Sequence, residues 1–279
     1  MIEPIDLNLG GVDRIVGAYV METTDGPALF DCGPSSTLPR LEEGLRSRGI
    51  ELKEIRHLLL SHIHLDHAGA AGAIVRTNPE MTVWVSDVGA PHIVDPSRLE
   101  RSARRLYGDA FDSLWGELAP VPEQNVRIAD GDVVGLDAFP TPGHASHHVS
   151  YLDANGTLWA GDAVGVRIQP SRHVFPGTPP PDVDIDAWQR TIASIAQRHP
   201  ERMALIHYGV ATDVDEHLHR LTLELEALSR LVHDGIPMDE YVQHIRASIE
   251  DAERYNHAAP FDQAWQGLRR YWDKQATSL

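Results

Sequence analysis

The sequence predicts an α/β protein in which a layered domain precedes a helical C-terminal appendage. Over residues 1–210, short apolar stretches that suit buried strands alternate with amphipathic stretches that suit helices. The recurring order of strand, helix and strand is typical of α/β layers. Histidine and aspartate residues follow several of the apolar stretches, and residues 211–279 have helical spacing throughout. We therefore expect the functional residues to lie at strand ends of the first domain.

Strands are predicted where short apolar or alternating stretches are bounded by turn residues. The first two surround a turn at residues 23–26, and a second hairpin surrounds Asp153-Ala154-Asn155-Gly156. The predicted strands cover residues 15–21, 28–30, 55–60, 81–85, 126–128, 133–134, 138–139, 149–152, 157–160 and 203–206.

Helices are predicted where apolar residues recur at helical spacing and a stop signal follows, as at Gly49 and at Asp234-Gly235. They cover residues 38–48, 68–76, 185–199, 214–233, 237–255 and 261–274. Residues 91–122 are expected to form a polar, partly helical insertion. The proline-rich residues 167–182 cannot form regular structure, and they are either a stiff lip beside a site or a plain surface loop.

The composition excludes several classes of function. The 279 residues include 24 Lys and Arg against 41 Asp and Glu, and the net charge of −17 argues against general binding to nucleic acid or to an anionic membrane. Cys32 is the single cysteine, which excludes an intramolecular disulfide and suits a reducing compartment. The acidic N-terminal residues do not resemble a secretory signal, and no apolar stretch reaches membrane-spanning length. We expect a cytoplasmic protein whose partner is a small-molecule substrate.

A metal centre is predicted directly after the apolar residues 58–60. Four strong metal ligands, His62, His64, Asp66 and His67, stand there within six residues, and no packing pattern of a strand or helix accounts for them. Their spacing requires a turning loop between a strand and a helix. Further candidate ligands follow later predicted strands, namely His144, Asp162 and His207. Five imidazoles and two carboxylates suit two Zn²⁺ ions, or other divalent metals such as Fe, Mn or Co, better than calcium or magnesium.

Five segments of the chain resemble the motifs of the metallo-β-lactamase-fold hydrolases. They are the histidine motif Ser61-His62-Ile63-His64-Leu65-Asp66-His67-Ala68-Gly69, the third histidine motif Thr141-Pro142-Gly143-His144, the bridging-aspartate motif Ala160-Gly161-Asp162, the last histidine in His207-Tyr208-Gly209 and the acidic turn Asp31-Cys32-Gly33. The resemblance implies a four-layered αβ/βα sandwich as the catalytic domain over residues 1–210, with a helical subdomain over residues 211–279.

The resemblance also implies how the ligands are shared. His62, His64 and His144 would hold one metal ion, Asp66, His67 and His207 the other, and Asp162 would bridge them. A hydroxide between two such ions would attack a carbonyl or phosphoryl group, and Asp66 would orient it and pass a proton to the leaving group.

Within this superfamily the chain is similar to the lactonase and glyoxalase II-like branch. The true β-lactamases are secreted and lack the bridging aspartate that Asp162 supplies here. We expect a dinuclear zinc hydrolase of a small ester, lactone or thioester, with phosphoesters as a further class. One alternative is an oxidoreductase resembling persulfide dioxygenases, with one iron, and another is a non-catalytic metal-binding module. The apolar positions of the appendage predict packing on its own domain, with a homodimer as the weaker alternative.

Several other polar residues have two interpretations. Asp31 either caps a loop or orients a metal-binding histidine, and the resemblance favours the second role. His147 and His148 are expected to support the site rather than to react, His173 to be a packing or surface residue, and Tyr208 to pack away from His207.

The insertion contains four arginines that form a basic stripe if it is helical. They are Arg98, Arg101, Arg104 and Arg105. Such a stripe either meets an acidic substrate or is a solvated face paired with nearby acids, and the charge of the chain favours the solvated face.

Overall fold

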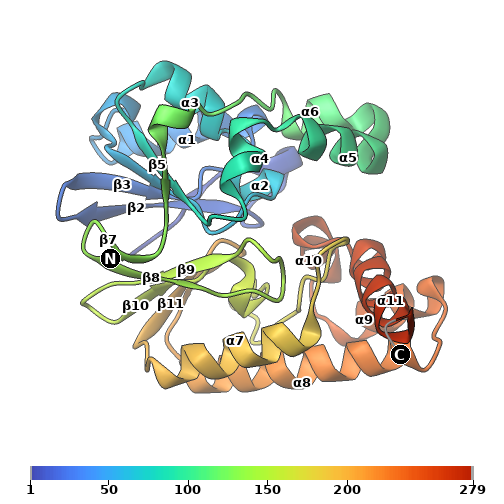
Figure 1. Ribbon diagram of the computed structural model, residues 1–279. Coiled ribbons are helices and arrows are strands. Elements are labelled where there is room, and N and C mark those ends of the chain that lie inside the picture. Colours follow the sequence, from blue (N-terminus) through green and yellow to red (C-terminus); the bar gives the residue numbers. More distant parts are fainter. Residues whose placement is uncertain (1, 278–279) are drawn as a thin grey trace.

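The structure is a computed structural model that describes residues 2–277. Within this range the chain forms two six-stranded sheets that lie face to face, and helices cover the outer face of each (Figure 1). This arrangement is the predicted four-layered αβ/βα sandwich, so the predicted fold class is confirmed.

The first sheet contains the N-terminal strands in chain order. They are β1 (Ile5–Asp6), β2 (Gly17–Thr23), β3 (Gly26–Phe30), β4 (His57–Leu59), β5 (Thr82–Val85) and β6 (Val126–Ile128). β2 and β3 form the predicted antiparallel hairpin, and β3 to β6 run parallel to one another. The carboxyl ends of β3 and β4 therefore meet at one edge of the sheet.

The second sheet contains the remaining strands, also in chain order. They are β7 (Gly131–Val133), β8 (Leu136–Pro140), β9 (Val149–Leu152), β10 (Thr157–Trp159), β11 (Arg202–Leu205) and β12 (Gly209–Ala211). β9 is antiparallel to both β8 and β10, and β11 is parallel to β10. Because β8, β10 and β11 run in one direction, the loops that follow them lie at the same edge.

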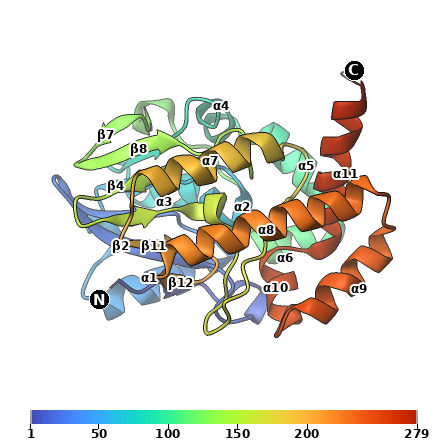
Figure 2. The ribbon, with the colours of Figure 1, turned by 90° about the horizontal axis from the view of Figure 1, so that it is seen from below.

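The helices divide between the two outer layers and one end of the molecule. They are α1 (Leu38–Ser47), α2 (Leu65–Ala68), α3 (Ala71–Thr77), α4 (Ala90–Val94), α5 (Ser97–Tyr107), α6 (Phe111–Trp115), α7 (Ile185–Gln197), α8 (Val214–His233), α9 (Met238–Ser248), α10 (Ala252–Ala258) and α11 (Phe261–Thr277). α1 and α3 cover the first sheet, and α7 and α8 lie side by side on the second (Figures 1 and 2). The boundary proposed at residue 210 remains a prediction.

Aromatic side chains hold the two sheets together. Tyr19 and Phe30 on the first sheet contact Trp159 on the second, with ring centroids 5.5 and 5.9 Å apart. Tyr151 of the second sheet donates a hydrogen bond of 2.9 Å from its hydroxyl to the carbonyl oxygen of Leu60. These side chains are buried. The hydrogen bond of Tyr151 therefore offsets the free-energy cost of burying its hydroxyl and the carbonyl oxygen of Leu60, which lies just before the histidine motif.

Two predicted helices are interrupted. The helix expected at 68–76 is divided, and the chain forms α2 and α3 with a break between them. At the break, Cys32 N–H donates to the carbonyl oxygen of His67 and Ala70 N–H donates to the carbonyl oxygen of Gly33, each at 2.8 Å. These hydrogen bonds replace those of a continuous helix. The helix expected at 237–255 breaks between α9 and α10, where Asp251 has a φ of 61°. The short edge strands β1 and β12 were not predicted, since two or three residues show no measurable alternation.

No helix among residues 2–277 combines the length and the apolar character needed to cross a membrane.

Candidate metal centre

The seven predicted ligands come together at the edge where the strand ends of the two sheets meet. The histidine motif follows β4, and His144, Asp162 and His207 follow β8, β10 and β11. The sandwich brings these loops together because the two sheets face each other with β4 and β10 running to the same end. Residues as far apart in the sequence as His62 and His207 thus share one site.

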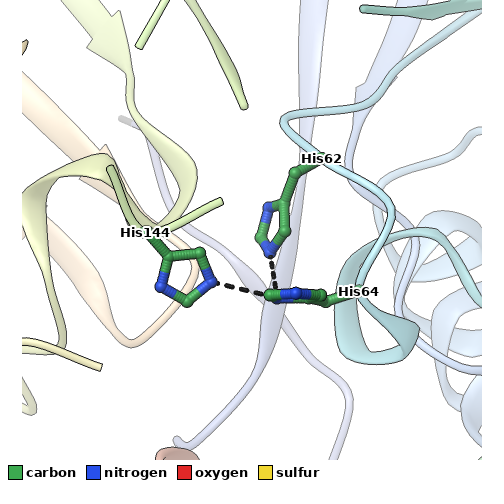
Figure 3. Close-up of side chains that lie close together, drawn as sticks. All are labelled: His62, His64 and His144. Carbon is green, nitrogen blue, oxygen red and sulfur yellow. Dashed lines mark hydrogen bonds between the residues drawn. The ribbon is translucent and has the colours of Figure 1, made fainter. Parts of the chain in front are cut away.

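Three imidazoles from both sheets converge at one point of the centre (Figure 3). Nε2 of His62 lies 2.9 Å from Nδ1 of His64, and Nε2 of His144 lies 3.0 Å from the same Nδ1 atom. His62 and His64 come from the loop after β4, whereas His144 comes from the opposite sheet. Three ring nitrogens arranged in this way can hold one metal ion.

A second set of donor atoms lies next to the first. Nε2 of His207 is 3.4 Å from a carboxylate oxygen of Asp66, and Nε2 of His67 is 3.6 Å from the same oxygen. Oδ1 of Asp162 lies 3.4 Å from Nε2 of His67 and 3.5 Å from Nε2 of His207, while its Oδ2 lies 3.4 Å from Nε2 of His144. Asp162 therefore faces both groups of histidines.

The outward ring nitrogens of four histidines are held by oxygen atoms. Nδ1 of His67 donates to Asp31 at 2.7 Å, and Nδ1 of His144 donates to the carbonyl oxygen of Gly177 at 2.7 Å. Nδ1 of His62 contacts Oγ of Ser61 at 3.0 Å, and Nδ1 of His207 contacts the carbonyl oxygen of Ile15. A proton on Nδ1 leaves the lone pair of Nε2 directed into the centre, which is the tautomer that a metal ion requires.

Asp31 makes the contact that an orienting role requires. Its carboxylate is completely buried and accepts three hydrogen bonds of 2.7 Å, from Nδ1 of His67 and from the amide and hydroxyl of Ser61. Burial raises the pKa of Asp31, and His67 and Ser61 oppose that rise. Asp31 thus links the end of β3 to the histidine motif after β4.

The electrostatics of the centre separate the two groups of histidines. Burial, together with the other imidazoles, holds the pKa values of His62 and His64 well below the ordinary value, so both rings are neutral. Burial also acts on His67 and His207, but the neighbouring carboxylates, Asp162 foremost, outweigh it and raise their pKa values. In the absence of cations these two rings keep protons that a divalent ion would displace.

Two buried atoms support occupation of the centre by cations. Nε2 of His67 and Oδ1 of Asp162 are buried and have no hydrogen-bond partner among residues 2–277. Leaving such atoms unpaired is costly, and a metal ion between them satisfies both. The donor set of five imidazoles and two carboxylates therefore fits two borderline divalent ions such as zinc.

His148 supports the centre without entering either set of donors. Its Nε2 accepts a hydrogen bond of 3.0 Å from the backbone amide of Asp162, and its Nδ1 lies 2.8 Å from Oγ1 of Thr141. The adjacent Gly161 has a φ of 52°, and a Cβ there would lie 2.5 Å from the Cβ of Ser61. The turn that presents Asp162 therefore requires glycine at this position.

A network behind the centre was not predicted. The guanidinium of Arg167 binds both carboxylate oxygens of Asp213 at 2.7 and 3.1 Å, and its backbone N–H donates to the carbonyl of His207. Nε2 of His217 donates to the carbonyl of Val164 at 2.8 Å. α8 is thereby tied to the loops that carry Asp162 and His207. No sequence signal marks this network, because its members belong to a loop and a helix 46 or more residues apart.

A cavity of about 790 Å³ opens from the centre. His64, Asp66, His144 and Asp162 line its base, and the insertion, the proline-rich loop and the C-terminal helices line its walls. Gly177 to Asp182 belong to the lining, so the proline-rich residues form a lip beside the site and not a remote loop.

The four arginines of the basic stripe are exposed, as a solvated face requires, but among the described residues only Arg104 has the expected acidic partners. Arg104 pairs with Glu100 and Asp112, as a solvated face would. Arg98 and Arg105 instead line the cavity. The difference arises because residues seven apart share one face of a helix, and the sequence does not show which face of α5 meets the cavity.

Tyr208 does not line the cavity, and its ring lies under the guanidinium of Arg14 at 5.4 Å. His173 is partly buried and contacts the ring of Tyr255 outside the cavity lining. Both placements agree with the packing roles expected from the sequence.

Comparison with known proteins identifies a family. The family model described as the metallo-beta-lactamase superfamily matches residues 11–207. A Bacillus subtilis protein described as uncharacterized is 29% identical over 163 residues, which cover 54% of this chain and 63% of that protein. An N-acyl homoserine lactonase of a Bacillus species is 28% identical over 167 residues, which cover 50% of this chain and 59% of the lactonase. The matches thus span less than two thirds of these relatives.

Among solved structures, a metallo-beta-lactamase family protein from Thermus thermophilus has the same fold. The TM-score is 0.71 at 19% sequence identity, and the superposition covers 99% of this chain and 93% of that one.

Proposed function

The chain belongs to the metallo-beta-lactamase superfamily, and from that premise we propose that it is a hydrolase of a small ester, lactone or thioester that uses two divalent metal ions. The observation that carries the proposal is the pair of adjoining donor sets that share Asp162. Two adjoining sets of donors suit two ions better than one.

We assign the donors by their mutual distances. Nε2 of His62, Nδ1 of His64 and Nε2 of His144 would hold one ion, and Asp66, His67 and His207 would hold the other, with Asp162 between them. Zinc suits this donor set best, and Fe, Mn or Co are the other divalent metals it would accept. When bound, the ions would lower the pKa of the attacking water and polarise the oxygen of the bond under attack.

Asp66 is the residue that we propose to move the proton. Its carboxylate lines the cavity, and although burial opposes ionisation, His67 and His207 hold its pKa at about 2. An ionised carboxylate at the base of the cavity can accept a proton from the attacking water. It can then deliver that proton to the leaving oxygen or sulfur.

The cavity and the relatives together support the proposed substrate class. A largely apolar cavity of about 790 Å³ suits a small organic molecule, and a lactonase among the relatives supports a lactone or a related acyl substrate. Phosphoesters are a further class for the same centre. We propose no nucleic acid or membrane partner, and the homodimer and the cytoplasmic location remain predictions.

A substrate panel tests the proposal. Lactones, thioesters, aryl esters and phosphodiesters are offered to the zinc-loaded wild type and to Asp66→Ala. We expect at least one acyl class to be hydrolysed and its kcat to fall by about 100-fold or more in the variant, because the proton relay and one donor are lost. Asp130→Ala is the matched control, since this carboxylate is exposed on the turn between β6 and β7. Undiminished activity of Asp66→Ala would exclude this centre as the site of reaction.

Metal analysis separates this proposal from the alternative of an iron oxidoreductase. Protein purified without added metal should bind about two ions per chain when titrated with zinc. One iron per chain together with sulfur-dependent oxygen uptake would contradict a hydrolase and favour the persulfide dioxygenase-like alternative.

A further inference from the structure

The cavity is larger than an ester, lactone or thioester group needs. Its base is the metal centre, and its walls come from two parts of the chain that face each other at one end of the molecule, the insertion with α5 and the C-terminal helices α10 and α11 (Figure 1). The hydroxyl of Tyr107 on α5 donates a hydrogen bond of 3.5 Å to Gln263 on α11. The two walls therefore meet over the centre and enclose space for the body of a substrate.

Apolar side chains form most of these walls. Leu99, Ala103 and Leu106 line the cavity from α5, and Ala259 and Ala264 line it from the opposite side. Leu106 is 45% exposed, so its side chain is open to the space of the cavity. This lining favours a substrate whose body is a hydrocarbon chain or ring rather than a sugar or a peptide.

Two positive charges interrupt the apolar wall. Arg98 and Arg105 lie two helical turns apart on the same face of α5 and line the cavity. Among residues 2–277 neither guanidinium has a hydrogen bond or an ion pair, although Arg104 of the same helix has two acidic partners. Arg101 and Arg127 also lack an ion pair within the described residues, so what distinguishes Arg98 and Arg105 is their place in the wall of the cavity.

Asp95 acts electrostatically on Arg98 but does not line the cavity, and within residues 2–277 no acidic group of the lining forms an ion pair with Arg98 or Arg105. Asp66 and Asp162 lie at the base in the metal centre. Asp182 lies at the lip and accepts a hydrogen bond of 3.1 Å from the hydroxyl of Ser146. His92 and His257 also line the cavity and add no negative charge. The anion-binding side of the cavity is therefore α5.

We infer that the substrate is amphipathic and anionic, with an acyl bond at the metal centre, an apolar body along the cavity and a carboxylate or phosphate group held by Arg98 and Arg105. This inference rests on the proposed function. Guanidinium groups recognise both kinds of anion through paired hydrogen bonds. In the reaction, water oxygen bonds to the acyl carbon, the acyl C–O or C–S bond breaks, and the proton goes to the leaving group, with no oxidant or reductant.

Pairs of substrates that differ only at the far end test this inference. They are made in the acyl class that the wild type hydrolyses, for example mono-4-nitrophenyl suberate against 4-nitrophenyl octanoate, with a terminal phosphate ester as a third member. We measure kcat/KM for the zinc-loaded wild type, for the double variant Arg98→Gln/Arg105→Gln and for Arg101→Gln. Arg101 is the matched control, because it lies on the same helix and does not line the cavity.

We expect the wild type to prefer an anionic member over the neutral one. The double variant should lower this preference about tenfold, mainly through KM, because exposed charge pairs contribute less than buried ones. The preference should also fall as salt is added. The carboxylate and phosphate members show which anion is preferred, and turnover of the neutral member shows that the variant is folded.

Two results would overturn the inference. One is equal kcat/KM for the anionic and neutral members in the wild type, and the other is a loss of preference in Arg101→Gln as large as in the double variant. Absence of hydrolysis in every acyl class would instead refute the proposed function, so the two failures are distinguishable.

Discussion

Replacing Asp31 by asparagine should weaken the binding of one metal ion without removing the fold. Asp31 has a φ of 52°, a left-handed conformation that asparagine adopts more readily than most residues. Asparagine also has nearly the same shape, so backbone strain and cavity formation make little contribution. The change that remains is the loss of one acceptor oxygen and its charge.

The hydrogen bonds of Asp31 determine how the loss of one acceptor oxygen affects His67. Asp31 accepts hydrogen bonds from Nδ1 of His67 and from the amide and hydroxyl of Ser61, each at 2.7 Å. Asparagine has one acceptor oxygen, and its amide group would donate toward His67 or Ser61. If it donates to His67, the ring proton moves to Nε2, the atom that faces Asp66 and Asp162. The nitrogen that should hold the metal then has no free lone pair.

The expected losses of metal affinity and of stability can be judged from similar contacts in other metal sites. Losing the partner that orients a metal-bound histidine lowers metal affinity about 10-fold to 100-fold, which corresponds to about 1.4 to 2.7 kcal/mol. The weakened charged hydrogen bonds should also lower the free energy of unfolding by about 3 kcal/mol. Zinc competition against a chromophoric chelator measures the first quantity, and urea unfolding measures the second.

We expect one site of Asp31→Asn to bind zinc about 10-fold to 100-fold more weakly than in the wild type and the other to be unchanged, since the donors His62, His64 and His144 are not altered. Asp153→Asn is the control, because Asp153 also accepts backbone amides but lies in the hairpin between β9 and β10. Two tightly bound ions in Asp31→Asn would refute the argument that Asp31 sets the tautomer of His67.

Two further predictions concern the framework of the site. Burial lowers the pKa of His217 from 6.5 to about 4. Between these pH values the unfolded chain therefore binds more protons than the folded chain. The contribution of His217 to stability is complete above pH 6.5 and is lost as the pH falls toward 4. His217→Gln keeps a hydrogen-bond donor and an acceptor but does not titrate. Between pH 6.5 and pH 4, urea unfolding of the variant should show a loss of stability that is roughly 3 kcal/mol smaller than in the wild type. Parallel profiles of stability against pH would contradict this prediction. In Gly267→Ala, the new Cβ would lie 1.9 Å from the carbonyl oxygen of Thr178, so α11 must move from the lip. Calorimetry should show a Tm lower by about 5 °C, whereas helix propensity alone would raise it.

Short segments of the sequence were enough to predict much of the candidate site. Leu58 to Leu60 is apolar enough to form a buried strand, and the ligands of the histidine motif follow at a spacing that only a turning loop can accommodate. The other candidate ligands were predicted at the ends of later strands, and the structure has loops of the expected kind there. The alternation of strands and helices likewise predicted the layered fold, because periodicity depends on which face of each element is buried.

The contacts between distant segments were decided by the tertiary structure. The carbonyl oxygens of Gly177 and Ile15 hold His144 and His207, yet every residue has a carbonyl oxygen, so no residue type reveals which one will be used. The break between α2 and α3 has the same origin, since hydrogen bonds with the loop after β3 replace those of a continuous helix.

By itself, the sequence determined the candidate donor residues of this protein, their order along the chain and the layered α/β class. The tertiary structure decided which donors face each other, which backbone oxygens orient them and which arginines of α5 meet the cavity. The physical reason is that side-chain chemistry and secondary-structure preference belong to short segments. The shape and charge of a cavity depend on how segments far apart in the sequence pack together.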